Sequence, residues 1–167
     1  MTLSLVRRAA VGLAVGLLAT SGFAANVLSL KEKVELTAPP QKVWELIKDF
    51  DGWQNWHPAV ASTEITSGKG NTHGTVRVLT TKDGARITER LDRYQPKIFS
   101  YTYRITDSPL PVADYVSTLQ VKATKSGSVV TWSSHFKAKE GTPDADALKT
   151  MRDIYTAGLN SLRDKVK

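Results

Sequence analysis

The chain has 167 residues, of which 41% are hydrophobic and 23% are charged. These proportions are those of an ordinary folded domain, and they exclude a disordered tail, a collagen-like repeat and a multi-span membrane protein. The sequence contains no cysteine, which excludes disulfide frameworks, thiolate metal sites and cysteine nucleophiles. The formal net charge is +7, but the basic residues are scattered, and we predict no nucleic-acid partner.

The first 24 residues have the pattern of a cleavable secretory signal peptide. Arg7 and Arg8 precede an uncharged apolar stretch over residues 9–19, and small residues follow up to Ala24. This stretch is shorter than the roughly 20 residues of a membrane span, so cleavage after Ala24 is favoured over an uncleaved anchor. We therefore expect a periplasmic protein with no stable membrane span, whose mature domain is residues 25–167. That domain has 21 basic and 16 acidic side chains, a net charge of +5.

A strand and a short helix are predicted at the start of the mature domain. Residues 28–36 alternate between polar and apolar side chains, as a strand does. A pair of prolines then opens a helix over residues 41–50, since proline is well tolerated in the first helical turn. The next segment, WQNWHPAV, predicts a stiff aromatic loop. The apolar side of the helix is made of Val43, Trp44, Ile47 and Phe50.

From residue 60 the hydrophobic period changes to two, and turn residues separate a series of strands. The last segment returns to a period of 3.6, with Thr142 as the expected N-cap of a long amphipathic helix. Such a helix has to cover one face of a curved antiparallel sheet, which leaves a cavity between the two. The strands are predicted over residues 60–66, 75–81, 85–94, 98–106, 114–124 and 129–139.

This order of elements resembles the START/Bet v 1-like (SRPBCC) superfamily. Its α+β helix-grip fold wraps a curved antiparallel sheet around a long C-terminal helix. The segment APPQKVWELIKDFDGWQNWHPAV (38–60) is similar to the opening of the polyketide cyclase/dehydrase type. Other segments of the chain resemble MxaD-type proteins, which are periplasmic accessories of methanol oxidation. These segments are GKGNTHGTVRVLTTKDG, RITERLDRY, SYTYRITDSPLPVADYVSTLQV and VTWSSHF.

Strand alternation predicts which side chains face the cavity. Trp53, Trp56 and His57 are expected near its mouth. Aromatic rings with polar tips suit an apolar ligand, although the same residues are equally consistent with plain core packing. The expected ligand-binding set is Trp53, Trp56, His57, Glu89, Tyr101, Tyr103, Tyr115, Trp132, Met151 and Tyr155.

Glu89 and His57 are the two candidates for acid–base chemistry. Glu89 falls on an apolar strand face, where burial would raise its pKa. The structural alternatives are an ion pair with Arg77 or Arg104 on a neighbouring strand, or a carboxylate at the cavity edge that faces water. His57 has an ordinary pKa near neutrality, and its structural alternative is a loop histidine that hydrogen-bonds to the backbone.

The remaining histidines, His73 and His135, are expected to be exposed. The three histidines have no metal-ligand spacing, and we predict neither a metal site nor a cofactor. No Ser-His-Asp or glycine-elbow motif is present. Strong catalytic chemistry is therefore not indicated by the sequence.

Three functions are consistent with these features. The resemblance to MxaD-type proteins implies a non-enzymatic accessory that assists methanol dehydrogenase and its cytochrome c electron acceptor. The aromatic lining favours a carrier or sensor for a small hydrophobic or lipid-like ligand. The family type also implies a cyclase or dehydratase that uses Glu89 and His57, but a second convergent catalytic carboxylate is missing.

Overall fold

An antiparallel sheet of seven strands forms the body of the computed structural model, which describes residues 26–166. The expected signal peptide of residues 1–24 lies outside the described residues. The strands are β1 (Leu28–Leu36), β2 (Val60–Ser67), β3 (Val76–Thr81), β4 (Arg86–Gln95), β5 (Ser100–Asp107), β6 (Val112–Thr124) and β7 (Gly127–Ala138). Two α-helices, α1 (Pro40–Ile47) and α2 (Asp144–Lys165), and two 3-10 turns, η1 (Trp53–Asn55) and η2 (Pro96–Ile98), complete the fold.

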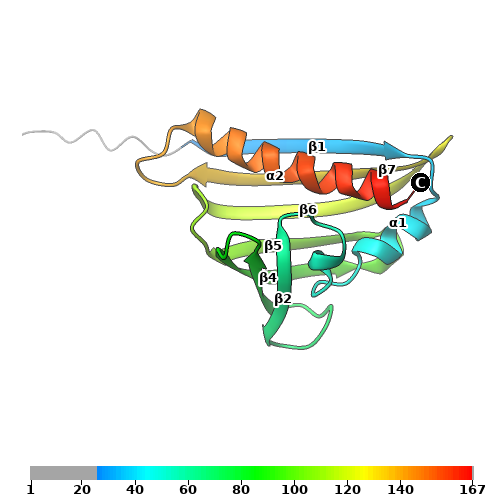
Figure 1. Ribbon diagram of the computed structural model, residues 1–167, viewed down its shortest axis with the longest axis horizontal. Coiled ribbons are helices and arrows are strands. Elements are labelled where there is room, and N and C mark those ends of the chain that lie inside the picture. The colour runs from blue at the N-terminus through cyan, green and yellow to red at the C-terminus, as the bar shows by residue number, and fades with distance from the viewer. Residues whose placement is uncertain (1–25, 167) are drawn as a thin grey trace, which may run out of the picture.

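The strand order is β1-β7-β6-β5-β4-β3-β2, so chain neighbours pair and β1 returns to the edge beside β7. Register shifts interrupt the ladders of β2 with β3, β4 with β5 and β6 with β7. Such bulges bend and twist a sheet. Figure 1 shows the result: α2 runs along β1 and β7, while β2 crosses their direction at the far end of the sheet. The curved sheet and C-terminal helix form a helix-grip fold.

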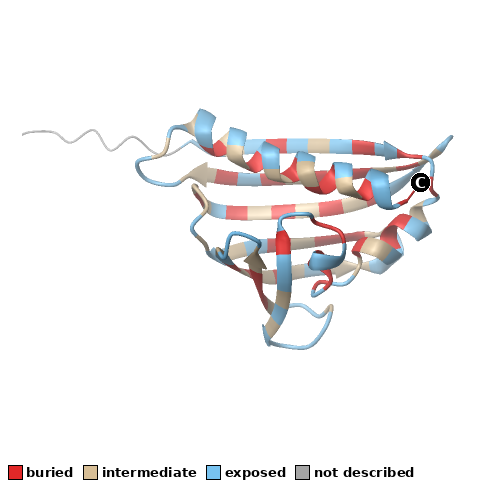
Figure 2. Cartoon of the chain, in the orientation of Figure 1, coloured by how far each residue is buried: buried red, intermediate tan, exposed pale blue. Residues whose placement is uncertain are grey.

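Helix α2 forms because its sequence suits both its ends and its inner face. Acidic residues lie in the first turn and basic residues in the last turn, which complements the helix dipole. Its buried residues recur every three to four positions and pack towards the sheet, as Figure 2 shows. The expected N-cap was wrong by one residue, because Pro143 and not Thr142 precedes the first helical turn. The buried residues are Ala147, Met151, Tyr155, Gly158, Leu159 and Leu162.

Two other predicted boundaries are also corrected. The first helix ends at Ile47 instead of residue 50, although Phe50 is buried as expected. Strand β5 begins at Ser100 instead of residue 98, because residues 96–98 form a 3-10 turn and Phe99 has a left-handed backbone with φ of 50°. A left-handed phenylalanine is rare, so the pattern of apolar residues gave no sign of it. Within residues 26–166, no helix combines the length and the apolar composition of a membrane span.

Candidate ligand-binding site

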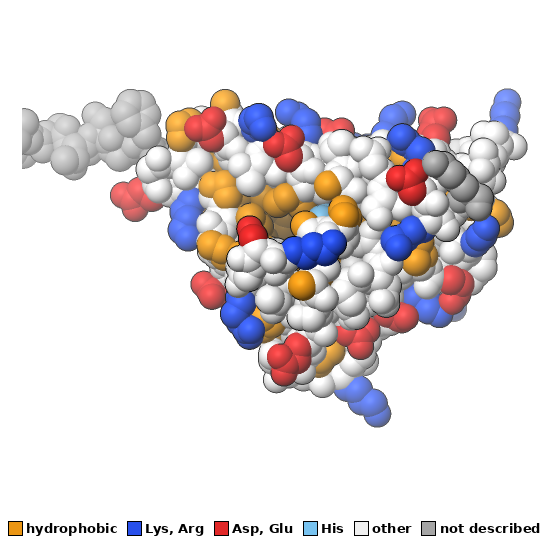
Figure 3. Space-filling view, in the orientation of Figure 1, with side chains coloured by type: hydrophobic (Ala, Val, Ile, Leu, Met, Phe, Trp, Pro, Cys, Tyr) orange, Lys and Arg blue, Asp and Glu red, His pale blue; other side chains and the backbone are white. Residues whose placement is uncertain are grey.

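A cavity of about 350 Å³ lies between α2, the inner face of the sheet and the loop that follows α1. Its walls are predominantly apolar, and Figure 3 shows hydrophobic side chains gathered in a hollow on this face of the molecule. The exposed rim includes Lys82 and Asp83 from the β3–β4 hairpin and Pro109 from the β5–β6 loop. Met151 and Ile154 of α2 form the opposite wall.

Eight of the ten residues predicted to bind a ligand line this cavity. Trp56 and Tyr101 do not, because both are buried in the core behind the wall. The Tyr101 hydroxyl accepts a hydrogen bond of 3.0 Å from Trp53 Nε1. The centroids of the Trp56 and Trp53 rings are 4.8 Å apart. Trp53 and His57 line the cavity but are each only 3% exposed, so their side chains do not form its solvent-exposed rim. The exposed part of the rim comes from the β3–β4 hairpin and the β5–β6 loop.

Trp132 connects the cavity wall to Ser117, a buried serine outside the predicted ligand-binding set. Its Nε1–H lies 3.1 Å from the Tyr103 hydroxyl and 2.9 Å from Ser117 Oγ. Ser117 Oγ in turn donates to the Ser133 carbonyl at 3.0 Å. Ser117 lies two residues after Tyr115, so both side chains lie on the inner face of β6. Strand periodicity could therefore have identified Ser117.

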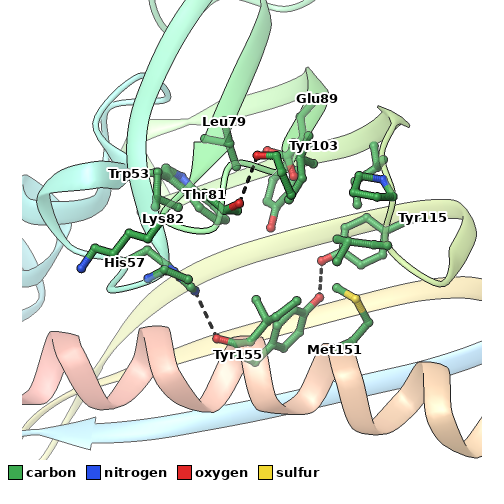
Figure 4. A pocket seen from close by; sticks show the side chains of 18 of the residues that line it. Trp53, His57, Leu79, Thr81, Lys82, Glu89, Tyr103, Tyr115, Met151 and Tyr155 are labelled. Atoms are coloured by element: carbon green, nitrogen blue, oxygen red, sulfur yellow. Dashed lines mark hydrogen bonds between the residues drawn. The ribbon is translucent and has the colours of Figure 1, made fainter.

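Two tyrosine hydroxyls continue this network towards α2. Tyr155 lies 3.2 Å from Ser117 Oγ and shares a short hydrogen bond with Tyr115 (Figure 4). Burial raises the pKa of Tyr155 to about 12 and raises the pKa values of Tyr103 and Tyr115 well above the usual value for tyrosine. These phenols are therefore neutral at physiological pH and act as hydrogen-bonding groups.

A buried ion pair lies at one side of the cavity, which its carboxylate partner Glu89 lines. Arg77 on β3 and Glu89 on β4 are direct cross-strand partners, and Arg77 Nε and Nη2 donate to Glu89 Oε2 at 2.8 and 2.5 Å. The guanidinium carbon lies 3.9 Å from the centre of the Phe50 ring and 4.1 Å from that of Trp53. Arg77 also donates to the Phe50 carbonyl, so aromatic faces and a backbone oxygen replace the water around this cation.

The ion pair settles which structural alternative applies to Glu89. Its partner is Arg77, whereas Arg104 donates to Asp92 at 2.7 Å on the outer face. Burial raises the pKa of Glu89, and the charge and hydrogen bonds of Arg77 oppose this rise. A protonated Glu89 would leave the guanidinium as an uncompensated buried charge, so the ionised carboxylate is the form that fits this site.

His57 uses both ring nitrogens to hold the loop against α2. Nδ1 accepts from the Ala59 backbone N–H at 3.3 Å, which places the proton on Nε2, 3.1 Å from the Ile154 carbonyl. Burial lowers the pKa of His57 to about 4, and the positive charge of Arg77 adds to the effect. A neutral imidazole with both nitrogens occupied suits a positioning role better than proton transfer.

Gly158 allows α2 to approach His57 and Trp132. A Cβ at this position would lie 2.7 Å from His57 Cδ2 and 2.9 Å from Trp132 Cζ3, and both rings are buried. Helix propensity alone predicts that Gly158→Ala stabilises the protein by about 1 kcal/mol. We expect a net loss of about 1 kcal/mol or more, because overpacking a rigid core costs about 1–3 kcal/mol. The midpoint of urea unfolding measures this change in stability, and a raised midpoint in the variant would contradict this packing.

The other histidines lie away from the cavity. His73 and His135 are exposed, as predicted. His73 Nδ1 lies 2.7 Å from the Asp92 carbonyl and His135 Nδ1 lies 2.9 Å from Ser29 Oγ. Over residues 26–166, no three His, Cys, Asp or Glu side chains are grouped as a metal site would require.

Comparison with known proteins gives the family of the chain. The family model for polyketide cyclase/dehydrase and lipid transport matches residues 27–167. The solved structure of the protein XoxI from Bacillus cereus is 34% identical, with a TM-score of 0.72 over 86% of this chain and 96% of that one. An uncharacterised protein from Bacillus thuringiensis is also 34% identical, with a TM-score of 0.74 over 84% of this chain and 98% of that one.

A more distant structure supports the fold alone. Ara h 8.0201 is 20% identical to this chain, with a TM-score of 0.71 over 84% of this chain and 98% of that one. The family match covers nearly the whole described domain, and the sheet, C-terminal helix and cavity agree with it. The chain belongs to the polyketide cyclase/dehydrase and lipid transport family and has a helix-grip fold.

Proposed function

We propose that this protein binds a small hydrophobic or lipid-like ligand in the cavity between α2 and the sheet. The observation that carries the proposal is the cavity itself, which has a volume of about 350 Å³ and mostly apolar walls. Small-molecule sites in proteins have this character: concave, apolar and supplied with a few polar groups that orient the ligand.

The polar groups favour binding over catalysis. His57 cannot accept a proton on Nδ1 without losing the hydrogen bond from Ala59, and Glu89 is held by Arg77. The buried tyrosines are neutral, since burial raises their pKa values. A cyclase or dehydratase is therefore the weaker alternative, because a general base needs a basic group that is free to take up a proton.

Narrowing the cavity is expected to weaken binding. Ile87 lines the cavity from β4, so Ile87→Phe places a larger side chain in the space of the ligand. We expect at least about a tenfold loss of affinity, or about 1.4 kcal/mol, for the neutral apolar fluorophore N-phenylnaphthylamine. Fluorescence titration measures it.

The matched control makes the same substitution outside the cavity. Ile98 is 50% exposed in η2 and does not line the cavity, so Ile98→Phe is expected to bind the fluorophore as the unmodified protein does. If the unmodified protein fails to bind it saturably, or if both variants bind it equally well, the proposed function is wrong.

We also propose, as a second function, that the exported protein assists methanol dehydrogenase and its cytochrome c in the periplasm. Support comes from the resemblance to MxaD-type proteins and from the net charge of +5 on residues 25–167. A positive surface would steer the protein to an acidic partner, and salt would weaken the contact. Affinity capture from the periplasmic extract of the host tests this, and failure to recover either protein at low salt would count against it.

A further inference from the structure

One carboxylate oxygen inside the cavity lacks a hydrogen-bond partner. Glu89 is 3% exposed and lines the cavity. Both hydrogen bonds from Arg77 end on Oε2, and no other group within residues 26–166 donates to Oε1. A carboxylate oxygen that faces an apolar cavity is a strong hydrogen-bond acceptor.

A hydroxyl donor lies on the same side of the cavity. Figure 4 shows Tyr103 beside Glu89, across the cavity from Tyr155 and Met151. The Tyr103 oxygen accepts a hydrogen bond from Trp132 Nε1, and its own O–H still needs an acceptor.

Ser117 is the other polar side chain beside the Tyr103 hydroxyl. Its Oγ donates to the Ser133 carbonyl, accepts from Trp132 and has Tyr155 as a third neighbour. A hydroxyl has one donor and two acceptor positions, so these three partners fill Ser117 when Tyr155 donates to it. In this arrangement the Tyr103 hydrogen is available to a molecule in the cavity.

We propose that the ligand is a neutral apolar molecule with one hydroxyl group, which lies between Glu89 and Tyr103. The ligand O–H donates to Glu89 Oε1, and the ligand oxygen accepts from the Tyr103 O–H. This inference rests on the proposed ligand-binding function and adds the chemical class of the ligand. A carboxylate is disfavoured, because its charge would lie beside that of Glu89, whose counter-ion Arg77 is already engaged.

Four probes of one shape test this inference by calorimetric titration of the full chain. They are naphthalene, β-naphthol, the methyl ether of β-naphthol and β-naphthoate. The ether is the more apolar of the two oxygen-bearing neutral probes but cannot donate, so an apolar cavity alone would favour it. We expect β-naphthol to bind at least about tenfold more tightly than the ether, which corresponds to one hydrogen bond to a charged group. β-Naphthoate is expected to bind more weakly than β-naphthol by at least the same factor.

A pair of matched variants tests the role of Tyr103. Tyr103→Phe removes the donor, and Trp132 keeps Ser117 as an acceptor, so the fold should persist. We expect a five- to tenfold loss for β-naphthol, as for one neutral hydrogen bond, and no change for naphthalene. Tyr101→Phe is the control, because Tyr101 is equally buried on the same strand but does not line the cavity.

The outcomes separate the two proposals. If naphthalene binds but β-naphthol binds no more tightly than its ether, or if Tyr103→Phe and Tyr101→Phe behave alike, the hydroxyl inference is wrong and apolar binding stands. If none of the four probes binds, the proposed function fails and the inference fails with it.

Discussion

Glu89→Leu is expected to lower the free energy of unfolding by about 3–5 kcal/mol. The substitution leaves the Arg77 guanidinium, which is fully buried, without its counter-ion and without two hydrogen bonds. The contacts with Phe50 and Trp53 compensate only part of this loss, since cation–π contacts contribute about 2 kcal/mol at buried sites. Urea unfolding at neutral pH measures the change.

The double variant Arg77→Met with Glu89→Leu separates the charge from the packing. Replacing a whole buried ion pair by apolar residues is often neutral or stabilising, so we expect most of the lost stability to return. Arg104→Met is the control at the exposed pair with Asp92, where a change of about 1 kcal/mol or less is expected. A Glu89→Leu variant as stable as Arg104→Met would show that the buried pair is not formed.

Acidification is expected to destabilise the protein through His57. Its pKa is about 4 in the folded protein, against an ordinary value of 6.5, so the unfolded chain binds the proton more readily between these values. Stability is then complete above about pH 6.5 and falls as the pH decreases to 4. The contribution is about 3 kcal/mol, because one pKa unit corresponds to 1.36 kcal/mol.

Two glutamine variants isolate this contribution from that of the carboxylates. His57→Gln should lose about 3 kcal/mol less than the unmodified protein between pH 7 and pH 4. His73→Gln, at an exposed histidine, should retain the original pH dependence. Urea midpoints at the two pH values give the comparison, and parallel curves for all three proteins would contradict the buried, neutral state of His57.

The order of strands and helices could be predicted because each element has its own period of hydrophobic residues in the sequence. The period of two from residue 60 onward and the apolar stripe of α2 are local signals, and both were correct. The boundary at Phe99 was not predictable in this way, since its left-handed backbone belongs to a sharp turn after Pro96. The centroids of the Phe99 and Trp44 rings are 5.8 Å apart, and this contact joins residues that are far apart in the sequence.

The site was predicted in part, for a similar reason. Alternation placed Glu89, Tyr103 and Trp132 on inner faces, and all three line the cavity. It could not show that Tyr101, on the same face as Tyr103, lies behind the wall. Depth in the core depends on sheet curvature and on where α2 packs, and neither is encoded in one strand.

The hydrogen bonds of the site were the least predictable feature. The sequence indicates Arg77 only as a possible partner of Glu89, and the structure shows it fully buried between aromatic rings. The pairing becomes visible once the β3–β4 register places the two residues opposite each other. The bonds of His57 to Ala59 and Ile154 likewise require the loop and α2 to be in place.

Native mass spectrometry of the protein purified from its own host tests the central claim most directly. We predict one small neutral molecule retained per chain, released when the protein unfolds and absent from the Ile87→Phe variant. A protein that is purified empty, and that also fails to bind N-phenylnaphthylamine and β-naphthol, would contradict ligand binding in this cavity.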